Sequence, residues 1–295
     1  MKNNINKKTC AVVILYNPTK KELENVKYLS EFVERLIIYD NSEVSIINQI
    51  SNIKNTTTLS KNENMGIGFA LNSSIQLAKE EGFKKIFLFD QDSKIDKNFV
   101  PEMLSFSKNI DAALWVPNYY DENAKKFGIF VIFNYWIKNR ILCENKDKLF
   151  IDFAITSGSL LNIDIWTKIS YFNEKYFIDH VDTEYCLRVK KNNYRVAVNC
   201  NTVLKHKIGE ATRHKIFGKV FTTSNHNEIR RYYISRNYVA LIKQFKLPSL
   251  FFSYLFYLLK TFIFILFYED NKKQKIFQSF IGCIDGIKNK MGKKN

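Results

Sequence analysis

Short apolar runs alternate with helical patterns across the first two hundred residues, and this alternation restricts the fold more than any other feature. The runs at 11–16, 36–39 and 86–89 are apolar on both faces, so each predicts a strand buried on two sides. Residues 56–59 and 112–116 are further strand candidates. Strands and helices that alternate at this spacing predict an α/β fold with a mostly parallel central sheet flanked by helices.

The segments between and after these runs are less uniform. Apolar positions at helical spacing predict a helix over 72–81, with Gly82 as its stop, and another helix over 181–191. Regular structure is expected to resume at 151–155, and a strand that leads to His206 is expected at 195–198. The stretch 119–150 is aromatic and charged without clear periodicity, and we interpret it as an insertion over the functional site.

Polar side chains follow the predicted strands at the points where the strands end. They are Asn17, Asp40, Asp90 and Asp92. In open parallel sheets, ligands bind beyond the carboxyl ends of the strands. We therefore expect these four side chains to converge at one edge of the sheet and to form part of a binding site.

Asp90 and Asp92 stand on either side of Gln91, directly after a buried strand. Two carboxylates at this spacing can hold one hard cation together with a phosphate, and that cation would neutralise the charge of a leaving diphosphate. The alternative is a solvated aspartate pair that caps the next helix. The apolar run at 86–89 favours the ligand site, because it carries the pair to the edge of the sheet.

A glycine-containing loop precedes the predicted helix at 72–81. Gly66 and Gly68 permit close backbone approach or a positive φ, and the helix offers free N–H groups to an anion. The loop, which includes Asn64, matches neither the dinucleotide fingerprint nor the phosphate-binding P-loop. An ordinary loop with asparagine caps is the alternative.

Asp182 lies at the start of the predicted helix over 181–191. A carboxylate at the N-cap, facing the loops, is a reasonable general base, and a purely structural N-cap is the alternative. Glu184 and Arg188 are spaced i, i+4, which predicts an ion pair on the helix surface.

The charge balance predicts an anionic partner. Lys and Arg number 45 against 29 acidic residues, for a formal net charge of +16. Nucleic acid, an acidic membrane and a phosphate-bearing substrate would all satisfy this excess. Basic residues concentrate at 205–219, at 230–246 and in the tail, without the pattern of a recognisable nucleic-acid module, so we expect no nucleic-acid partner.

The cysteines give no sign of a crosslinked or metal-bound scaffold. Their number is odd, they are widely spread, and no CxxC pair occurs among the five. The sequence therefore predicts neither a disulfide framework nor a zinc site. It favours a protein that works in a reducing compartment.

The character of the chain changes at residues 250–268, which would span roughly 28 Å as a helix, about one hydrocarbon thickness. Lys260 lies in the middle, and nine of the nineteen residues are Phe or Tyr. We rank a membrane-surface helix first, a buried packing helix second and a transmembrane helix third. The lysine-rich tail at 271–295 supplies a second signal for anionic lipid, so 236–295 is predicted to be a basic, aromatic, helical membrane-association region.

Several of these segments, taken in order, resemble glycosyltransferase family 2, and within it the bacterial rhamnosyltransferases. The resemblance extends from about residue 10 to His206 and more loosely through 230–237. It rests on the segments 12–17 (VVILYN), 39–42 (YDNS), 64–72 (NMGIGFALN), 89–93 (FDQDS), 156–159 (TSGS) and 177–188 (FIDHVDTEYCLR).

The resemblance implies a GT-A fold over residues 1–235, with a nucleotide-binding half at about 1–117 and an acceptor half at about 118–235. The donor nucleotide-binding residues that it implies are Asn17, Asp40, Asn64, Gly66 and Asp90. The acceptor side that it implies comprises Ser157, Gly158 and Glu184.

The resemblance also implies a divalent cation, magnesium or manganese, held by Asp90, Asp92 and His206. Asp182 matches the acidic position of the family's general base, although the usual Glu-Asp pair reads Val-Asp here. That departure leaves Asp179 as a second, weaker candidate for the base.

The activity implied is inverting transfer of a sugar, with L-rhamnose from dTDP-L-rhamnose favoured, to a hydroxyl of a polyprenyl-diphosphate-linked glycan in surface-polysaccharide synthesis. The enzyme would be peripheral at the cytoplasmic face of the plasma membrane, on an anionic lipid surface. A non-catalytic subunit of a polysaccharide-assembly complex with the same fold is the alternative. The sequence leaves the oligomeric state open, a homo-oligomer included.

Overall fold

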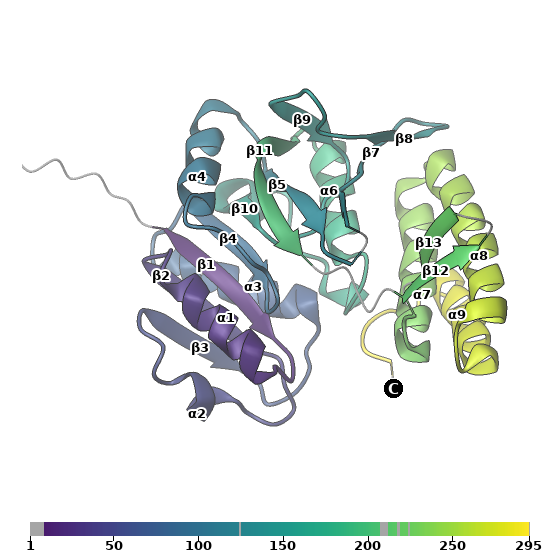
Figure 1. Ribbon diagram of the computed structural model, residues 1–295, viewed down its shortest axis with the longest axis horizontal. Helices are drawn as coiled ribbons and strands as arrows, with labels where there is room; N and C mark the ends of the chain where they lie inside the picture. Colours follow the sequence, from purple (N-terminus) through teal and green to yellow (C-terminus); the bar gives the residue numbers. More distant parts are fainter. Residues whose placement is uncertain (1–8, 124, 207–211, 217–218, 224, 295) are drawn as a thin grey trace, which may run out of the picture.

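A mixed nine-stranded sheet dominates the computed structural model (Figure 1). Residues 9–123, 125–206, 212–216, 219–223 and 225–294 are described, with the backbone alone from 206 to 222. The strands are β1 (Cys10–Leu15), β2 (Arg35–Asp40), β3 (Thr56–Ser60), β4 (Lys85–Asp90), β5 (Leu114–Asp121), β6 (Lys126–Phe127), β7 (Phe130–Phe133), β8 (Lys138–Ile141), β9 (Lys148–Ile151), β10 (Ser159–Asn162), β11 (Val196–His206), β12 (Thr212–Ile216) and β13 (Lys219–Thr223). The helices are α1 (Lys20–Ser30), α2 (Ile47–Ile50), α3 (Ile67–Glu80), α4 (Phe99–Asn109), α5 (Ile163–Lys168), the 3-10 helix η1 (Glu174–Tyr176), α6 (Val181–Lys191), α7 (Glu228–Phe245), α8 (Pro248–Tyr268) and α9 (Lys272–Ile287).

The sheet has the strand order β3-β2-β1-β4-β10-β5-β11-β9, with β6 beside β5. Within the described residues, six strands run in one direction, and β10, β9 and β6 run against their neighbours. The predicted α/β fold with a mostly parallel sheet is therefore confirmed.

Helices cover both faces of the sheet, so the strands are buried on two sides. On β1, Val12 packs in one apolar core with residues of α3, while Ala11 and Val13 pack in a second core with residues of α1 and α4. This alternation explains why the strand is apolar at every position rather than at every second one.

The register brings the ends of the central strands to one level. Leu15 of β1 pairs with Asp40 of β2, and Ile14 pairs with Asp90 of β4. Both aspartates are the last residues of their strands, so both lie at the carboxyl edge of the sheet, on either side of β1.

The region at 119–150 is built from short antiparallel strands, which its lack of helical or strand periodicity had hidden. β7 and β8 form a hairpin, and β9 pairs with β11. β9 ends at Ile151, so most of the segment at 151–155 lies outside the strand, whereas the strand predicted at 195–198 is confirmed from Val196 onward as the start of β11. β9 is an edge strand whose side chains alternate between buried and exposed, and a search for continuous apolar runs misses that pattern.

The expectation that the cysteines stay unpaired is also wrong. Cys143 and Cys200 are joined by a disulfide across 57 residues of sequence, with their Cα atoms 5.3 Å apart. The antiparallel pairing of β9 with β11 brings Cys200 of β11 beside the loop that precedes β9, since the Cys200 N–H donates to the Asp147 carbonyl at 3.0 Å. Cys10, Cys186 and Cys283 remain free thiols.

Three long helices follow the sheet, and α7 and α9 pack closely through two glycines. A Cβ at Gly282 would lie 2.3 Å from the Tyr232 carbonyl oxygen, and one at Gly286 would lie 2.6 Å from the Arg236 carbonyl oxygen. Larger residues at these positions would force the two helices apart. Because α7 runs without a break from Glu228 to Phe245, the division predicted at residue 235 does not coincide with the end of an element.

α8 is the one helix among the described residues that is long and apolar enough to cross a membrane. Its mean hydropathy reaches 2.0, and only 22% of its most apolar window is buried within the protein. A helix that packs inside a soluble domain would be mostly buried, so the exposed apolar surface of α8 is a distinct feature of this chain.

The start of α3 depends on Gly66. The helix begins at Ile67 rather than at residue 72, and Gly66 precedes it with φ 84° and ψ 165°, a conformation that is almost exclusive to glycine. A Cβ on Gly66 would lie 2.7 Å from the Phe177 carbonyl oxygen, which also accepts a 2.7 Å hydrogen bond from the Ile67 N–H. Gly66 therefore lets two distant loops meet.

We predict that Gly66→Ala lowers the free energy of unfolding by about 1–3 kcal/mol from backbone strain alone, with more from the clash with Phe177. Gly82→Ala is the matched control, because Gly82 has φ 86° and nothing within 4 Å of its missing Cβ. Urea denaturation of both variants separates strain from contact. Equal losses for the two variants would contradict the role given to the Phe177 contact.

Candidate active site

A chain of hydrogen bonds joins the carboxyl ends of the first strands. The Tyr16 N–H donates to the Gln91 side chain at 2.9 Å, and the Asn17 N–H donates to Ser42 Oγ at 2.9 Å. Asn17 itself has a positive φ of 46°. The loops after β1, β2 and β4 are thus fixed relative to one another, at the edge where the sequence predicts donor binding.

Asp40 is fully buried and organises the loop that follows β2. One carboxylate oxygen accepts the Ser42 N–H at 3.0 Å, and the other accepts the Ile46 N–H at 2.9 Å. Its contribution to the predicted nucleotide pocket is therefore to shape the loop, since both of its oxygens already accept backbone hydrogen bonds.

Asn41 connects this loop to the glycine loop, a role that the sequence interpretation missed. Its side-chain amide donates to Asn64 Oδ1 at 3.0 Å, and its side-chain carbonyl accepts the Met65 N–H at 2.8 Å. Asn64 Oδ1 in turn accepts the Gly66 N–H at 3.0 Å. The structure thus brings Asn64 and Gly66 into the same edge as the strand ends.

The turn after β4 holds Asp90 and Asp92, both half-buried, in place through Ser93. Ser93 Oγ accepts the Asp90 N–H at 2.9 Å and forms a short hydrogen bond with Ser157 Oγ. Ser157 is buried, and the neighbouring Gly158, with φ 76°, donates its N–H to the Leu88 carbonyl at 2.7 Å. Ser157 and Gly158, predicted on the acceptor side, therefore hold the turn that carries the two aspartates through their contacts with Ser93 and Leu88.

Asp182 lines a cavity of about 510 Å³ that it shares with Asp90 and Asp179. It lies in the first turn of α6, and His180 takes the N-cap position instead. Burial raises the pKa of Asp182 to about 7, and the neighbouring carboxylates of Asp179 and Asp90 contribute to the rise. Among the described residues no cation forms an ion pair with Asp182, so its carboxylate is well suited to take up a proton near neutral pH.

Asp179, the second candidate for the base, is committed to another partner. Arg230 donates three hydrogen bonds to its carboxylate at 3.1–3.2 Å. Burial raises the pKa of Asp179, while Arg230 opposes that rise. The geometry therefore favours Asp182 as the proton acceptor over Asp179.

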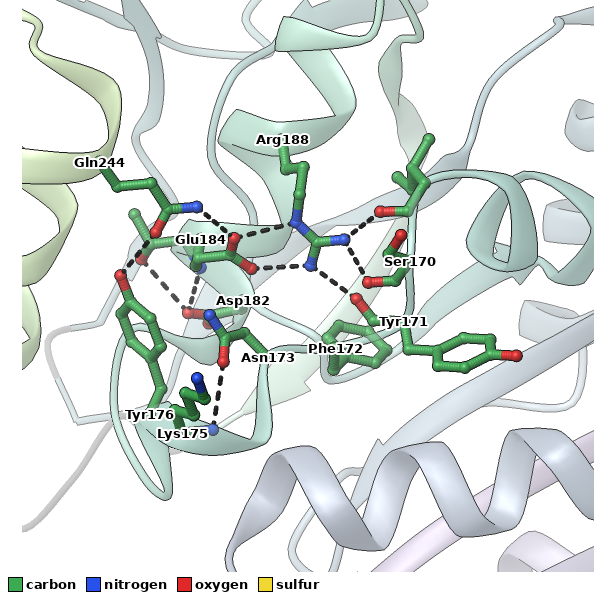
Figure 2. A network of polar contacts seen from close by, with 12 residues as sticks. Ser170, Tyr171, Phe172, Asn173, Lys175, Tyr176, Asp182, Glu184, Arg188 and Gln244 are labelled. Atoms are coloured by element: carbon green, nitrogen blue, oxygen red, sulfur yellow. Dashed lines mark hydrogen bonds and ion pairs between the residues drawn. The ribbon is translucent and has the colours of Figure 1, made fainter. Parts of the chain in front are cut away.

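Glu184 does not line this cavity and belongs instead to a network of polar contacts (Figure 2). It accepts from Arg188 at 2.8 and 2.9 Å and from the Gln244 amide at 2.7 Å. Arg188 also donates to the carbonyls of Ile169, Ser170 and Tyr171. The predicted Glu184–Arg188 ion pair is confirmed, but Glu184 is buried and Arg188 is only 15% exposed, and the Gln244 contact with Glu184 links α6 to α7.

The loop before α6 is held by α7, which the sequence interpretation also missed. The buried Asn237 amide lies 2.7–2.9 Å from three carbonyl oxygens of this loop, those of Tyr176, Ile178 and Asp179. Arg236 adds a hydrogen bond to the Tyr176 carbonyl at 3.0 Å. Both residues belong to the segment RRYYISRN at 230–237, and that resemblance was the available signal.

Of the three predicted cation ligands, the structure describes the side chains of Asp90 and Asp92. Among the described residues, no three His, Cys, Asp or Glu side chains gather into a metal-holding group. The backbone of His206 ends β11, and its side chain lies outside the described part of the chain. Asp90 and Asp92 nevertheless fit magnesium or manganese chemistry, because such ions are bound through one or two carboxylates together with substrate phosphates.

No protein-family model matches the chain. Among curated proteins it is similar to the dTDP-rhamnosyl transferase RfbF of Shigella flexneri, with 27% identity over 96% of this chain and 97% of that protein.

Among solved structures, the chain is similar to S. aureus TarS 1-349 in complex with UDP-GlcNAc, with a TM-score of 0.55 and 15% identity over 95% of this chain and 81% of that one. It is also similar to GalNAc-T7 with UDP, GalNAc and Mn2+, with a TM-score of 0.56 and 11% identity over 80% of this chain. The chain spans about half of the GalNAc-T7 structure, at 47%. At these identities the structural likeness concerns the fold. The chain is thus a GT-A-fold protein similar to the rhamnosyltransferases of glycosyltransferase family 2.

Proposed function

We propose that the protein is a nucleotide-sugar glycosyltransferase, with L-rhamnose from dTDP-L-rhamnose as the favoured donor. The observation that carries the proposal is the cavity in which Asp182, with a pKa of about 7, faces the same space as Asp90 at the carboxyl edge of the sheet. The full-length similarity to a dTDP-rhamnosyl transferase supports the choice of donor. A hydroxyl of a polyprenyl-diphosphate-linked glycan is the proposed acceptor.

The reaction is a single displacement with inversion. Asp182 accepts the proton of the acceptor hydroxyl, and the oxygen forms a bond to the anomeric carbon as the bond from that carbon to the nucleoside diphosphate breaks. The loops that carry Asn17, Asp40 and Asn64 hold the nucleotide. Asp90 and Asp92 would hold a divalent cation, which, when bound, neutralises charge on the departing diphosphate.

We predict that Asp182→Asn abolishes sugar transfer while donor affinity stays within about twofold, as measured by calorimetric titration with dTDP-rhamnose. The variant should also be more stable than the wild type at pH 8. The fold raises the pKa of Asp182 from 3.8 to about 7, so ionisation of this group costs the wild type stability as the pH rises through that interval. An active Asp182→Asn enzyme would remove Asp182 from the role of base.

For the wild-type enzyme, kcat/KM should rise as the pH increases through about 7, because only the ionised Asp182 can take the proton. Initial rates measured from about pH 5.5 to about pH 8.5 test this dependence, because the interval extends roughly 1.5 pH units on either side of the pKa of Asp182. A rate that is flat across this interval would contradict the assignment.

We expect exhaustive chelation to abolish transfer and added Mn²⁺ or Mg²⁺ to restore it. Asp92→Asn should raise the metal concentration for half-maximal rate by about tenfold or more, since it removes one of two carboxylate ligands. Asp111→Asn is the control, because Asp111 is exposed and precedes β5, at the opposite end of that strand from the site. Full activity after chelation would overturn the proposed role of Asp90 and Asp92.

The C-terminal helices are proposed to bind an anionic membrane from the cytoplasmic side. Phe252, Phe256 and Phe267 of α8 are 53%, 65% and 70% exposed. The tip of the β7–β8 hairpin adds Trp136, 65% exposed, and the hairpin contacts α8 through a 3.0 Å hydrogen bond from the Ser249 N–H to the Tyr135 carbonyl. Aromatic side chains beside basic ones are typical of membrane interfaces.

Trp136→Glu combined with Phe267→Glu should lower recovery of the protein with phosphatidylglycerol vesicles by about tenfold or more, because charged groups replace side chains that leave water. Tyr28→Glu is the control, since Tyr28 is 41% exposed on α1, far from α8 (Figure 1). Flotation assays measure the recovery. Equal recovery of the double variant and the control would contradict the proposed surface.

A further inference from the structure

The cavity that holds Asp182 has an aromatic wall contributed by α7 and α8. Tyr238 and Tyr257 both line it. Their rings stack with centroids 6.3 Å apart, and Tyr254 stacks on Tyr238 at 4.6 Å. The edge of His180 meets Tyr238 at 5.0 Å. The two cavity-facing tyrosines are thus parts of one ordered stack rather than isolated side chains.

A group of charged side chains holds the Tyr257 hydroxyl. Arg231 donates to the Tyr257 hydroxyl at 3.2 Å and forms a buried ion pair with Glu269 at 2.6 Å. Lys275 also pairs with Glu269, at 3.0 Å. Because Arg231 lies on α7, Glu269 is the C-cap of α8 and Lys275 lies on α9, the position of Tyr257 is set by the packing of all three helices.

Of the predicted donor residues, Asp90 alone lines this cavity, so the space borders the donor side only at the end of β4. None of Asn17, Asp40 and Asn64 lines the cavity, whereas the predicted base Asp182 does. A cavity that contains the predicted base, but not the loops that carry Asn17, Asp40 and Asn64, is where we expect the acceptor, whose hydroxyl gives up its proton to the base. Its volume of about 510 Å³ lies within the range of pockets for small ligands.

The chemistry of the wall suits a sugar ring. The C–H groups on one face of a pyranose form an apolar, electropositive surface that packs against the negative face of an aromatic ring, while its hydroxyls stay at the rim. Asp182 and Asp179 supply acceptors for those hydroxyls, and Arg230 and His226, which also line the cavity, supply donors.

We propose that Tyr238 and Tyr257 form the acceptor subsite, in which the sugar ring that receives the transferred residue stacks on this aromatic wall beside Asp182. The inference rests on the proposed transferase function. Phe256, the neighbour of Tyr257, is 65% exposed on the apolar face of α8. One helix therefore contributes both to the proposed membrane surface and to the wall of the cavity, as a lipid-linked acceptor requires.

The test uses the full-length enzyme with Tyr238→Leu, Tyr257→Leu and Tyr257→Phe. Leucine keeps apolar bulk and removes the flat ring, whereas phenylalanine removes only the hydroxyl. The donor is dTDP-rhamnose, or whichever nucleotide sugar the wild type hydrolyses in a screen. The acceptor probe is the polyprenyl-diphosphate glycolipid fraction extracted from the producing cells, used as a dilution series. Tyr28→Leu, on α1, is the control.

Both leucine variants should raise the apparent acceptor KM about tenfold or more and leave donor KM and acceptor-free donor hydrolysis within about twofold of wild type. Tyr28→Leu should match the wild type, and Tyr257→Phe, which keeps the flat ring, should raise the acceptor KM by less than Tyr257→Leu does. Thermal unfolding of each variant establishes that it is folded.

An unchanged acceptor KM in both leucine variants, or an equal rise in donor KM, would overturn the acceptor subsite and leave the transferase function intact. A wild-type protein that neither hydrolyses any nucleotide sugar nor labels the glycolipid fraction would instead overturn the proposed function itself.

Discussion

The predicted active site depends on a short segment before α6 whose residues adopt unfavourable backbone conformations. Phe177, Asp179 and His180 all have positive φ values, which L-residues rarely adopt. The Asn237 amide and the contact with Gly66 hold this segment from two sides, and α6 begins directly after it. The place of the predicted base is therefore determined by residues of α3 and α7 together, more than by the helix on which it lies.

Electrostatics at the site work against stability. Asp182, Asp179 and Asp90 are close enough to raise the pKa of Asp182 by mutual repulsion, in addition to the effect of burial. Arg230 compensates Asp179, while no described cation pairs with Asp182. Groups placed at such a cost are typical of functional sites, because a fold selected for stability alone would pair or expose them.

The sequence predicts much of the sheet, since buried parallel strands are continuous apolar runs that can be recognised without their neighbours. It also predicts the convergence of Asp40 and Asp90, because parallel strands end at one edge. The Cys143–Cys200 disulfide, the Asn237 contacts and the wall of Tyr238 and Tyr257 could not be predicted in this way. Each joins segments that are far apart in the chain, and no local periodicity marks such contacts. Glu184 illustrates the reverse case, since its spacing from Arg188 predicts the pair correctly but gives no indication that it is buried.

The dual orientation of α8 matters for protein production. Because its phenylalanines are exposed, α8 is an obvious segment to delete when a soluble sample is wanted. The same helix, however, carries Tyr257, which lines the cavity of Asp182. A shortened chain would lose one wall of that cavity and the Glu269 partner of Arg231. Polar replacements at outward positions such as Phe252 and Phe267 are the sounder engineering strategy, because they leave the inward side of the helix untouched.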